Sequence, residues 1–198
     1  YGSLNKLFSP LRLTLVSSAR ATGETMISIE RLDNIQHCVE YVIRNNVQGD
    51  LIETGVWRGR AVIFMKAILM AYGDRNRHVW VADSFHGLPK PNPELYPADQ
   101  NSKLWVLSFD IPQEEVMRNF QRYGLLDDRV RFLPGFFSET IPNAPIEKLA
   151  VLRLDGDMYQ STMEVLVHLY QKVSSGGFVI IDDYGWFKEC KQATDDFR

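Results

Sequence analysis

Residues 49–60, Gly-Asp-Leu-Ile-Glu-Thr-Gly-Val-Trp-Arg-Gly-Arg, decide the fold of this chain. A short apolar strand runs into Glu53, and Gly55 and Gly59 then precede an apolar helical run at 61–70. Because glycine has no Cβ, Gly55 lets the backbone turn tightly and approach a ligand closely. The free N–H groups of the following helix lie beside that turn. The stretch therefore predicts a strand, a glycine turn and a helix that cradle a nucleotide-type cofactor.

Length and composition favour a single domain, residues 1–198, with a sizeable core. The chain has 198 residues, of which 45% are hydrophobic and 24% are charged. Its net charge of -3 gives no reason to expect nucleic acid or an anionic membrane surface as a partner. No uninterrupted apolar run approaches about 18 residues, so we expect no membrane span. We interpret the two cysteines, Cys38 and Cys190, as intracellular thiols and expect a cytoplasmic location.

Apolar strands and amphipathic helices alternate along most of the chain. After an N-terminal helical arm and cap at 1–46, a core at 47–198 is expected. The expected helices cover 28–46, 59–72, 112–123, 159–173 and a stretch from 188, and the expected strands cover 50–54, 78–82, 130–135, 149–154 and 177–181. Continuous apolar strands separated by helices indicate an α/β fold, with a mostly parallel sheet and helices on both faces. Residues 86–103 hold four prolines and few aliphatics, and we expect residues 86–111 to form a functional lid loop.

Acidic residues end four of the five expected strands. In parallel α/β sheets, ligands bind beyond the carboxyl ends of the strands. An acid at such a position is also a common N-cap, and that role suits Asp157, before the helix at 159, as well as ligand binding does. Asp83 lies about 30 residues after the glycine turn and suits a ribose hydroxyl pair. The alternative for Asp83 is an acid on a surface loop.

Asp155, Asp182 and Asp183 predict a metal site if the strands that precede them are neighbours. Three carboxylates would then crowd together, and like charges raise one another's pKa. A divalent cation removes this conflict, and hard oxygen ligands suit Mg²⁺. The alternative is that one carboxylate caps a helix while the others face water.

A short-chain dehydrogenase is a competing interpretation of the glycine turn. Gly55 and Gly59 followed by Tyr184-x-x-x-Lys188 match that class superficially. However, Ala61 stands where its third glycine would fall. Tyr184 directly follows a strand end, whereas the catalytic tyrosine of that class lies inside a helix. The dehydrogenase interpretation is therefore disfavoured.

Several longer motifs together carry a family resemblance. They are Glu-Thr-Gly-Val-Trp-Arg-Gly at 53–59, Val-Ala-Asp-Ser-Phe at 81–85, Arg-Tyr-Gly-Leu-Leu-Asp-Asp at 122–128, Phe-Leu-Pro-Gly-Phe-Phe at 132–137, Leu-Arg-Leu-Asp-Gly-Asp at 152–157 and Ile-Ile-Asp-Asp-Tyr at 180–184. With these motifs the chain resembles the macrocin O-methyltransferase (TylF) family over about residues 22–185. No single motif is specific, but their combination is.

The resemblance implies a Rossmann-like class I methyltransferase fold, with C-terminal strands that we expect to be missing from this chain. It implies an O-methyltransferase that depends on S-adenosylmethionine and Mg²⁺ and acts in antibiotic biosynthesis. The implied partner is a small glycosylated acceptor, a macrolide-type natural product methylated on a sugar hydroxyl, and its identity stays open. The apolar N-terminal arm makes a homodimer or higher homo-oligomer reasonable. A protein that binds S-adenosylmethionine without catalysis is the alternative from another class.

Site residues are also implied by the resemblance. The implied cofactor-binding residues are Thr25, Met26, Glu53, Thr54, Gly55, Asp83, Ser84, Phe136, Ser138 and Asp155, and the implied metal ligands are Asp155, Asp182 and Asp183. Related catechol-type methyltransferases carry a lysine three residues after the first metal aspartate, and here that position is Met158. The general base is therefore open between Asp155 itself and His86, which opens the lid loop.

Overall fold

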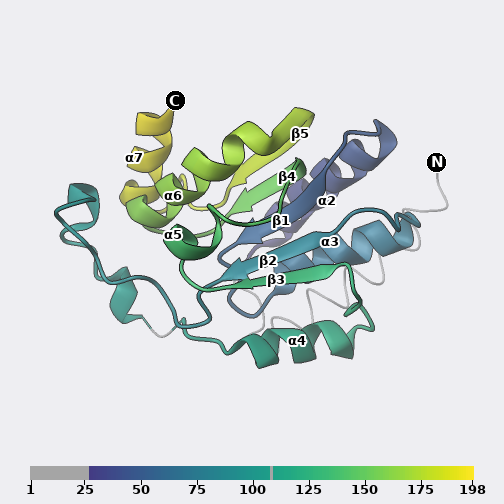
Figure 1. The fold of residues 1–198 in the computed structure, drawn as a ribbon, viewed down its shortest axis with the longest axis horizontal. Helices are drawn as coiled ribbons and strands as arrows, with labels where there is room; N and C mark the ends of the chain where they lie inside the picture. The colour runs from purple at the N-terminus through teal and green to yellow at the C-terminus, as the bar shows by residue number, and fades with distance from the viewer. Residues whose placement is uncertain (1–26, 108) are drawn as a thin grey trace.

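The computed structural model describes residues 27–107 and 109–198, and these form a parallel five-stranded sheet of order β3-β2-β1-β4-β5 (Figure 1). The strands are β1 Asp50–Thr54, β2 Val79–Asp83, β3 Val130–Pro134, β4 Leu149–Leu154 and β5 Val173–Ile181. The chain order reverses between β1 and β4, the point at which such sheets bind ligands. Residues 1–26 of the expected arm and cap, among them Thr25 and Met26, lie outside the described residues.

Helices lie before, between and after the strands. They are α2 Ile29–Arg44, α3 Arg60–Ala71, α4 Gln113–Arg122, α5 Phe137–Thr140, α6 Tyr159–Leu169 and α7 Lys188–Phe197, with 3₁₀ turns η1 Pro97–Asp99, η2 Leu104–Val106 and η3 Tyr170–Lys172. In the part of the chain that the structure describes, no helix is long and apolar enough to cross a lipid bilayer.

The strands divide the hydrophobic core into two halves because successive side chains point to opposite faces of the sheet. Leu51 and Val151 belong to the half that includes α2, α3 and α4. Ile52 and Leu152, one residue further along the same strands, belong to the half that includes α6. Helices therefore cover both faces, as the continuous apolar strands predicted.

Most expected elements are present with small shifts at their ends. Ser28 is the N-cap of α2, and its hydroxyl accepts a hydrogen bond from the Arg31 N–H. The largest difference is at β5, which begins at Val173 and not at Gly177. Its first residues are small, polar and partly exposed, so they lack the apolar signature of a buried strand. The preceding helix ends correspondingly early, at Leu169.

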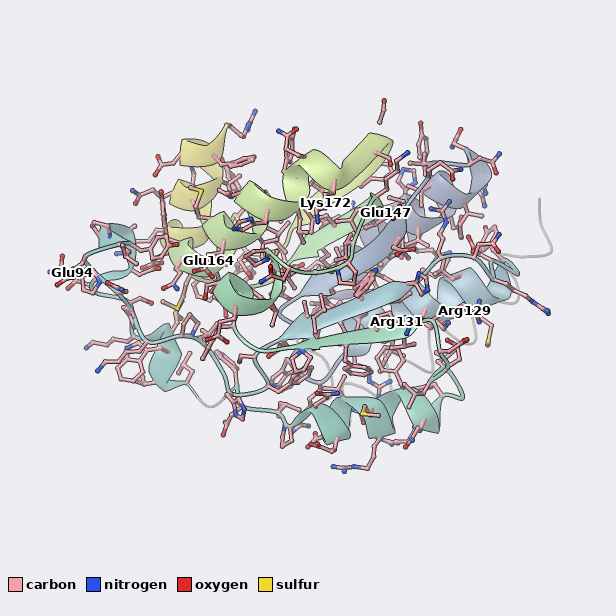
Figure 2. All side chains as sticks on the ribbon, viewed as in Figure 1. Glu94, Arg129, Arg131, Glu147, Glu164 and Lys172 are labelled. Carbon is pink, nitrogen blue, oxygen red and sulfur yellow. The ribbon has the colours of Figure 1, made fainter. Side chains whose placement is uncertain are left out.

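A buried lysine ties α3 to the segment that leads into β3. The Lys66 side chain is 2% exposed, and its ammonium lies 2.7 and 2.9 Å from the two oxygens of Asp127. Arg129, labelled in Figure 2, also pairs with Asp127. Burial acts to raise the pKa of Asp127, but the hydrogen bonds from Lys66 and Arg129 outweigh it and lower this pKa to about 2.

We expect Asp127→Asn to destabilise the fold by about 1–2 kcal/mol at pH 7, because it leaves a buried ammonium without its carboxylate. The expected loss of folding free energy is small because the Asp127 side chain is itself about one-third exposed to water. Since the folded-state pKa is depressed, the contribution is complete above about pH 4 and disappears as the pH falls toward 2. Urea denaturation at about pH 7, above this pH range, and at about pH 2.5, near its lower end, measures the loss of stability and its dependence on pH.

Lys66→Met is the matched control, since it removes the buried charge at similar volume. Its loss at pH 7 should be smaller than that of Asp127→Asn. A larger loss for Lys66→Met, or a difference between parent and Asp127→Asn that does not shrink in acid, would contradict this account.

Candidate functional site

A cavity of about 520 Å³ opens beyond the carboxyl ends of the five strands. Each strand end contributes a residue to its lining: Gly55, Asp83, Phe136, Asp155 and Asp182. All five are residues that the sequence analysis singled out, and Ser84 and Asp183 line the cavity too. The structure therefore brings most of the expected site residues to one place.

The glycine turn after β1 lies against the loop after β4. Gly55 has a φ of +85°, and a Cβ placed on it would lie 1.8 Å from the carbonyl oxygen of Asp155. No larger residue fits there without moving the backbone of one loop. At Gly55 the turn therefore forms a cradle that packs against the main chain of Asp155 and Gly156.

Asp83 shapes this turn from the neighbouring strand. One of its carboxylate oxygens accepts hydrogen bonds from the N–H groups of Val56 at 2.7 Å and Trp57 at 3.3 Å. The other oxygen accepts from Phe85 N–H at 2.8 Å. Burial nevertheless raises the pKa of Asp83 above its usual value. Asp83 thus has a demonstrable role in holding the cradle, beside the ribose role expected for it.

Arg153 joins the ends of three strands. It lies beside Glu53 in the parallel register of β1 and β4, and its side chain is fully buried. Its guanidinium binds the carboxylate of Glu53, that of Asp155 at 2.8 Å and that of Asp182 at 2.6 Å. Burial disfavours the charge of Arg153, but the three carboxylates outweigh this effect and raise its pKa. Burial also raises the pKa of Glu53 to about 8, against the lowering effect of Arg153.

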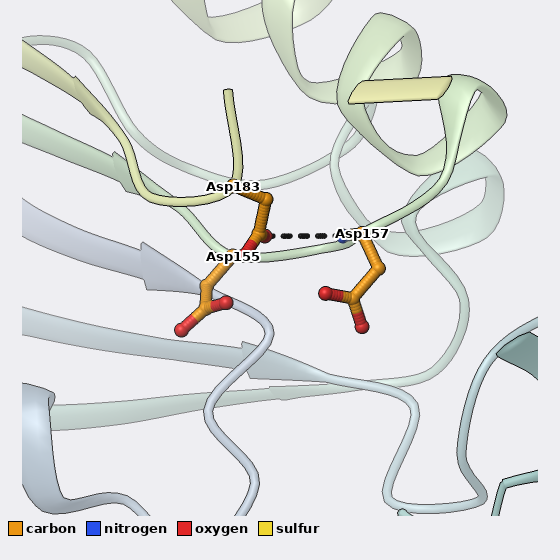
Figure 3. Close-up of side chains that lie close together, drawn as sticks. All are labelled: Asp155, Asp157 and Asp183. Atoms are coloured by element: carbon orange, nitrogen blue, oxygen red, sulfur yellow. Dashed lines mark hydrogen bonds between the residues drawn. The ribbon is translucent and has the colours of Figure 1, made fainter. Parts of the chain in front are cut away.

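Three carboxylates form a compact acidic cluster, defined as Asp155, Asp157 and Asp183 (Figure 3). One oxygen of each lies within 4.8 Å of the others. The Asp157 N–H donates to Asp183 at 3.3 Å, which ties the loops after β4 and β5 together. Burial and the negative neighbours raise the pKa of Asp157 to about 7 and that of Asp183 to about 9. A hard divalent cation fits this donor set, because it would relieve the repulsion and bind three carboxylate oxygens.

The cluster differs by one residue from the metal ligands implied by the sequence. Asp182 lies next to it, but its two oxygens bind Arg153 and, from α2, Arg31. Asp157, and not Asp182, is the third carboxylate of the acidic cluster. It is not the N-cap of α6, since that position belongs to Met158. The Asp-x-Asp spacing at 155–157 was the available signal, and the sequence alone left Asp157 undecided between capping and ligand binding.

Backbone strain concentrates around the cavity. Among the described residues, four that are not glycine have positive φ, and three of them, Trp57, Phe85 and Asp157, follow β1, β2 and β4. Such conformations cost roughly 1–3 kcal/mol each and persist only where the surroundings impose them. The strain falls at the strand ends where a ligand site was expected.

Among the expected site residues that the structure describes, four do not line the cavity. Glu53 and Thr54 are buried beneath it, with Glu53 bound to Arg153. His86 and Ser138 are exposed. Residues that the sequence analysis did not single out, namely Trp57, Trp186 and Phe187, supply aromatic surface instead. Aromatic residues are so common in cores that nothing in the sequence marked these as lining residues.

The sheet order, the glycine cradle after β1 and the acids beyond β4 and β5 define a Rossmann-like methyltransferase. Residues 13–198 match the model of the family described as Macrocin-O-methyltransferase (TylF), and the chain belongs to that family. It is an O-methyltransferase, so neither the dehydrogenase interpretation nor the non-catalytic alternative holds.

Individual relatives agree with this assignment. The chain is 55% identical over 182 residues to demethyldecarbamoylnovobiocin O-methyltransferase of Streptomyces niveus, covering 90% of this chain and 69% of the relative. It is 52% identical over 182 residues to the 8-demethyl-8-(2,3-dimethoxy-alpha-L-rhamnosyl)-tetracenomycin-C 4'-O-methyltransferase of Streptomyces olivaceus, with the same coverage. The solved structure of the O-methyltransferase NovP superposes with a TM-score of 0.81 at 54% identity, over 88% of this chain and 73% of that one.

We expect Gly55→Ala to abolish the cradle and cost more than about 3 kcal/mol, because it adds a backbone clash to an unfavourable φ. Gly73→Ala is the matched control. Gly73 has a φ of +70°, but nothing lies within 4 Å of a Cβ there, so only the strain of about 1 kcal/mol applies. Denaturant unfolding of both variants measures the difference, and equal losses would refute the close-contact account.

Proposed function

We propose that this chain transfers the methyl group of S-adenosylmethionine to a sugar hydroxyl of a glycosylated natural product, at a site that uses Mg²⁺. The observation that carries the proposal is the contact between the Gly55 cradle and the backbone of Asp155. It sets a main-chain cradle for one ligand directly beside an acidic cluster for another. The name of the Streptomyces olivaceus relative includes a rhamnosyl group, which supports a sugar as the acceptor.

The chain's own residues would mainly position the reactants. S-adenosylmethionine brings an already activated methyl group, so little covalent chemistry is left to the protein. In this proposal Gly55 and Asp155 border its methionine end, Asp83 and Ser84 meet its ribose, and Phe136 lies at its adenine. Glu53 and Thr54 act from beneath by holding Arg153, and Ser138, Thr25 and Met26 complete the expected binding set.

A divalent cation would contribute positive charge that lowers the pKa of the acceptor hydroxyl. Asp155 and Asp183 belong both to the acidic cluster and to the ligand set implied by the sequence, so we assign them as ligands. The third carboxylate is Asp157 or Asp182. Asp182 must release Arg31 or Arg153 before one of its oxygens is free, whereas Asp157 already lies within the cluster.

Proton removal from the acceptor is assigned to the acidic cluster. Asp157 lines the cavity, and in the absence of a cation, burial and the Asp155 charge raise its pKa to about 7, the range in which a general base works best at neutral pH. A bound cation would lower the pKa of any carboxylate that it contacts, so in this proposal Asp157 acts as the base where Asp182 supplies the third ligand. Asp155 is the second candidate, although one of its oxygens is held by Arg153. His86, expected as the other candidate, is exposed and does not line the cavity.

The lid loop would receive the part of the acceptor that lies away from the sugar. Leu88, Pro89 and Phe109 of this loop line the cavity together with Trp186 and Phe187. An apolar aglycone suits this surface.

We also propose that the chain forms a homo-oligomer, which gel filtration with light scattering would test.

Cation binding should depend on the cluster and on pH. We expect Asp183→Asn to weaken Mn²⁺ binding, measured by electron paramagnetic resonance, by at least about 10-fold. Because the carboxyl groups of Asp157 and Asp183 have raised pKa values, protons compete with the cation, so the affinity of the parent should rise between about pH 6 and pH 9. Asp157→Asn and Asp182→Asn compared side by side identify the third ligand. Unchanged Mn²⁺ affinity in Asp183→Asn would exclude the proposed cation site.

The general base is tested by turnover with a glycosylated acceptor. We expect Asp157→Asn to lower kcat by about 10²- to 10⁴-fold, while S-adenosylhomocysteine binding, followed by calorimetry, stays within about threefold. His86→Gln should keep kcat within about threefold, because its side chain is exposed. The opposite ranking of the two variants would assign the base to His86.

A further inference from the structure

The first turn of α6 is capped by a residue from the lid loop. Its own N-cap, Met158, makes no side-chain capping hydrogen bond. Instead the two carboxylate oxygens of Asp99 accept hydrogen bonds from the N–H groups of Tyr159, at 2.9 Å, and Gln160, at 2.8 Å. These donors lie 60 and 61 residues further along the chain. Two of the N–H groups that a helix leaves free are thus satisfied by the lid loop.

Asp99 is held firmly within the lid loop. It is fully buried at the end of η1, where its N–H donates to Tyr96 and its carbonyl accepts from Ser102. The Tyr96 hydroxyl also reaches Glu164 of α6, at 3.4 Å. Glu164, labelled in Figure 2, lines the cavity. In Figure 1 the part of the loop that carries η1 and η2 extends along the side of the molecule where α6 and α7 begin.

The acidic turn, residues 155–158, lies between β4 and the helix turn that Asp99 caps. Asp157 within it has a φ of +58°, so the turn needs support from both sides to keep this conformation. On the β4 side, the Asp155 N–H donates to Thr54 of β1 at 2.9 Å. On the α6 side, the Asp99 carboxylate fixes the residues that directly follow the turn.

We propose that Asp99 is a positioning residue for the acidic turn. By capping α6 from the lid loop, it keeps Asp155 and Asp157 in place and couples the lid loop to the cation site. The coupling to cation binding rests on the function proposed above, whereas the support of the turn does not. Because coupling between two sites is reciprocal, a loop that leaves α6 loosens the acidic turn, and a filled cation site favours a docked loop.

The test compares Asp99→Asn with Asp74→Asn. Asp74 is a matched control, because it also accepts two backbone hydrogen bonds, from Asn76 and Arg77 at 3.0 and 3.2 Å, in a loop that precedes β2. Peptide-resolved hydrogen exchange in the absence of cation reports on residues 155–160. Mn²⁺ affinity, measured by electron paramagnetic resonance, reports on the cation site without any turnover.

Asp99→Asn should exchange about tenfold faster than the parent at 155–160 and bind Mn²⁺ about tenfold more weakly, the size of a lost cap. Asp74→Asn should change neither, even where it lowers Tm. Asp99→Asn and Asp99→Ser each keep only one acceptor oxygen, so both should show the effect, and Asp99→Ser replaces Asp99→Asn if that variant does not fold.

If residues 155–160 of Asp99→Asn exchange their amide hydrogens at the same rate as in the parent, the proposal is overturned. Parent-like Mn²⁺ affinity combined with fast exchange also overturns it, because Asp99 would then support the helix and not the cation site. If the parent itself binds no Mn²⁺, the proposed cation site fails, and the exchange data alone decide whether Asp99 positions the turn.

Discussion

The buried charge of Arg153 is the constraint on which the site depends. A guanidinium removed from water costs several kcal/mol unless carboxylates surround it, and here three strands each provide one, through Glu53, Asp155 and Asp182. The parallel register sets Glu53 directly beside Arg153, and Asp155 follows two residues later on the same face of the sheet. The ion pairs therefore bind β1, β4 and β5 to one another at the edge of the sheet where the cavity opens.

Acidic residues outnumber basic ones at this edge, and that imbalance gives the site its chemistry. Arg153 compensates the carboxylates beneath the cavity, but Asp157 and Asp183 face it without a basic partner of their own among the contacts described. Their pKa values rise as a result. The same geometry that stabilises the sheet thus concentrates proton-binding and cation-binding capacity at its surface. Such a site favours the binding of a positively charged ligand, because that charge relieves the repulsion between the carboxylates.

The sequence predicted the fold, and many of the residues that it marked as candidate site residues line one cavity, but it did not predict the contacts among them. Apolar strands such as Leu149–Leu154 are long enough, and buried on both faces, to be read directly from residue type. The acids at the strand ends converge because parallel strands end at one edge. Arg153 was not recognised, although its alternation with Asp155 and its pairing with Glu53 follow from the period of two in β-strands. Whether Asp157 or Asp182 joins the cluster depends on the left-handed turn at Asp157 and on Arg31 of a distant helix. Neither feature can be recognised from the local sequence.

The contact between Gly55 and the Asp155 carbonyl also bears on how such enzymes diversify. The two loops touch main chain to main chain, so an insertion or deletion in either would separate the cradle from the acids and remove activity at once. The lid loop meets the rest of the molecule through side chains, such as the carboxylate of Asp99, which accepts hydrogen bonds from two amides of α6, and the hydroxyl of Tyr96. We expect length changes among homologues to accumulate in that loop, on either side of Asp99, so that acceptor preference changes while the reaction is preserved.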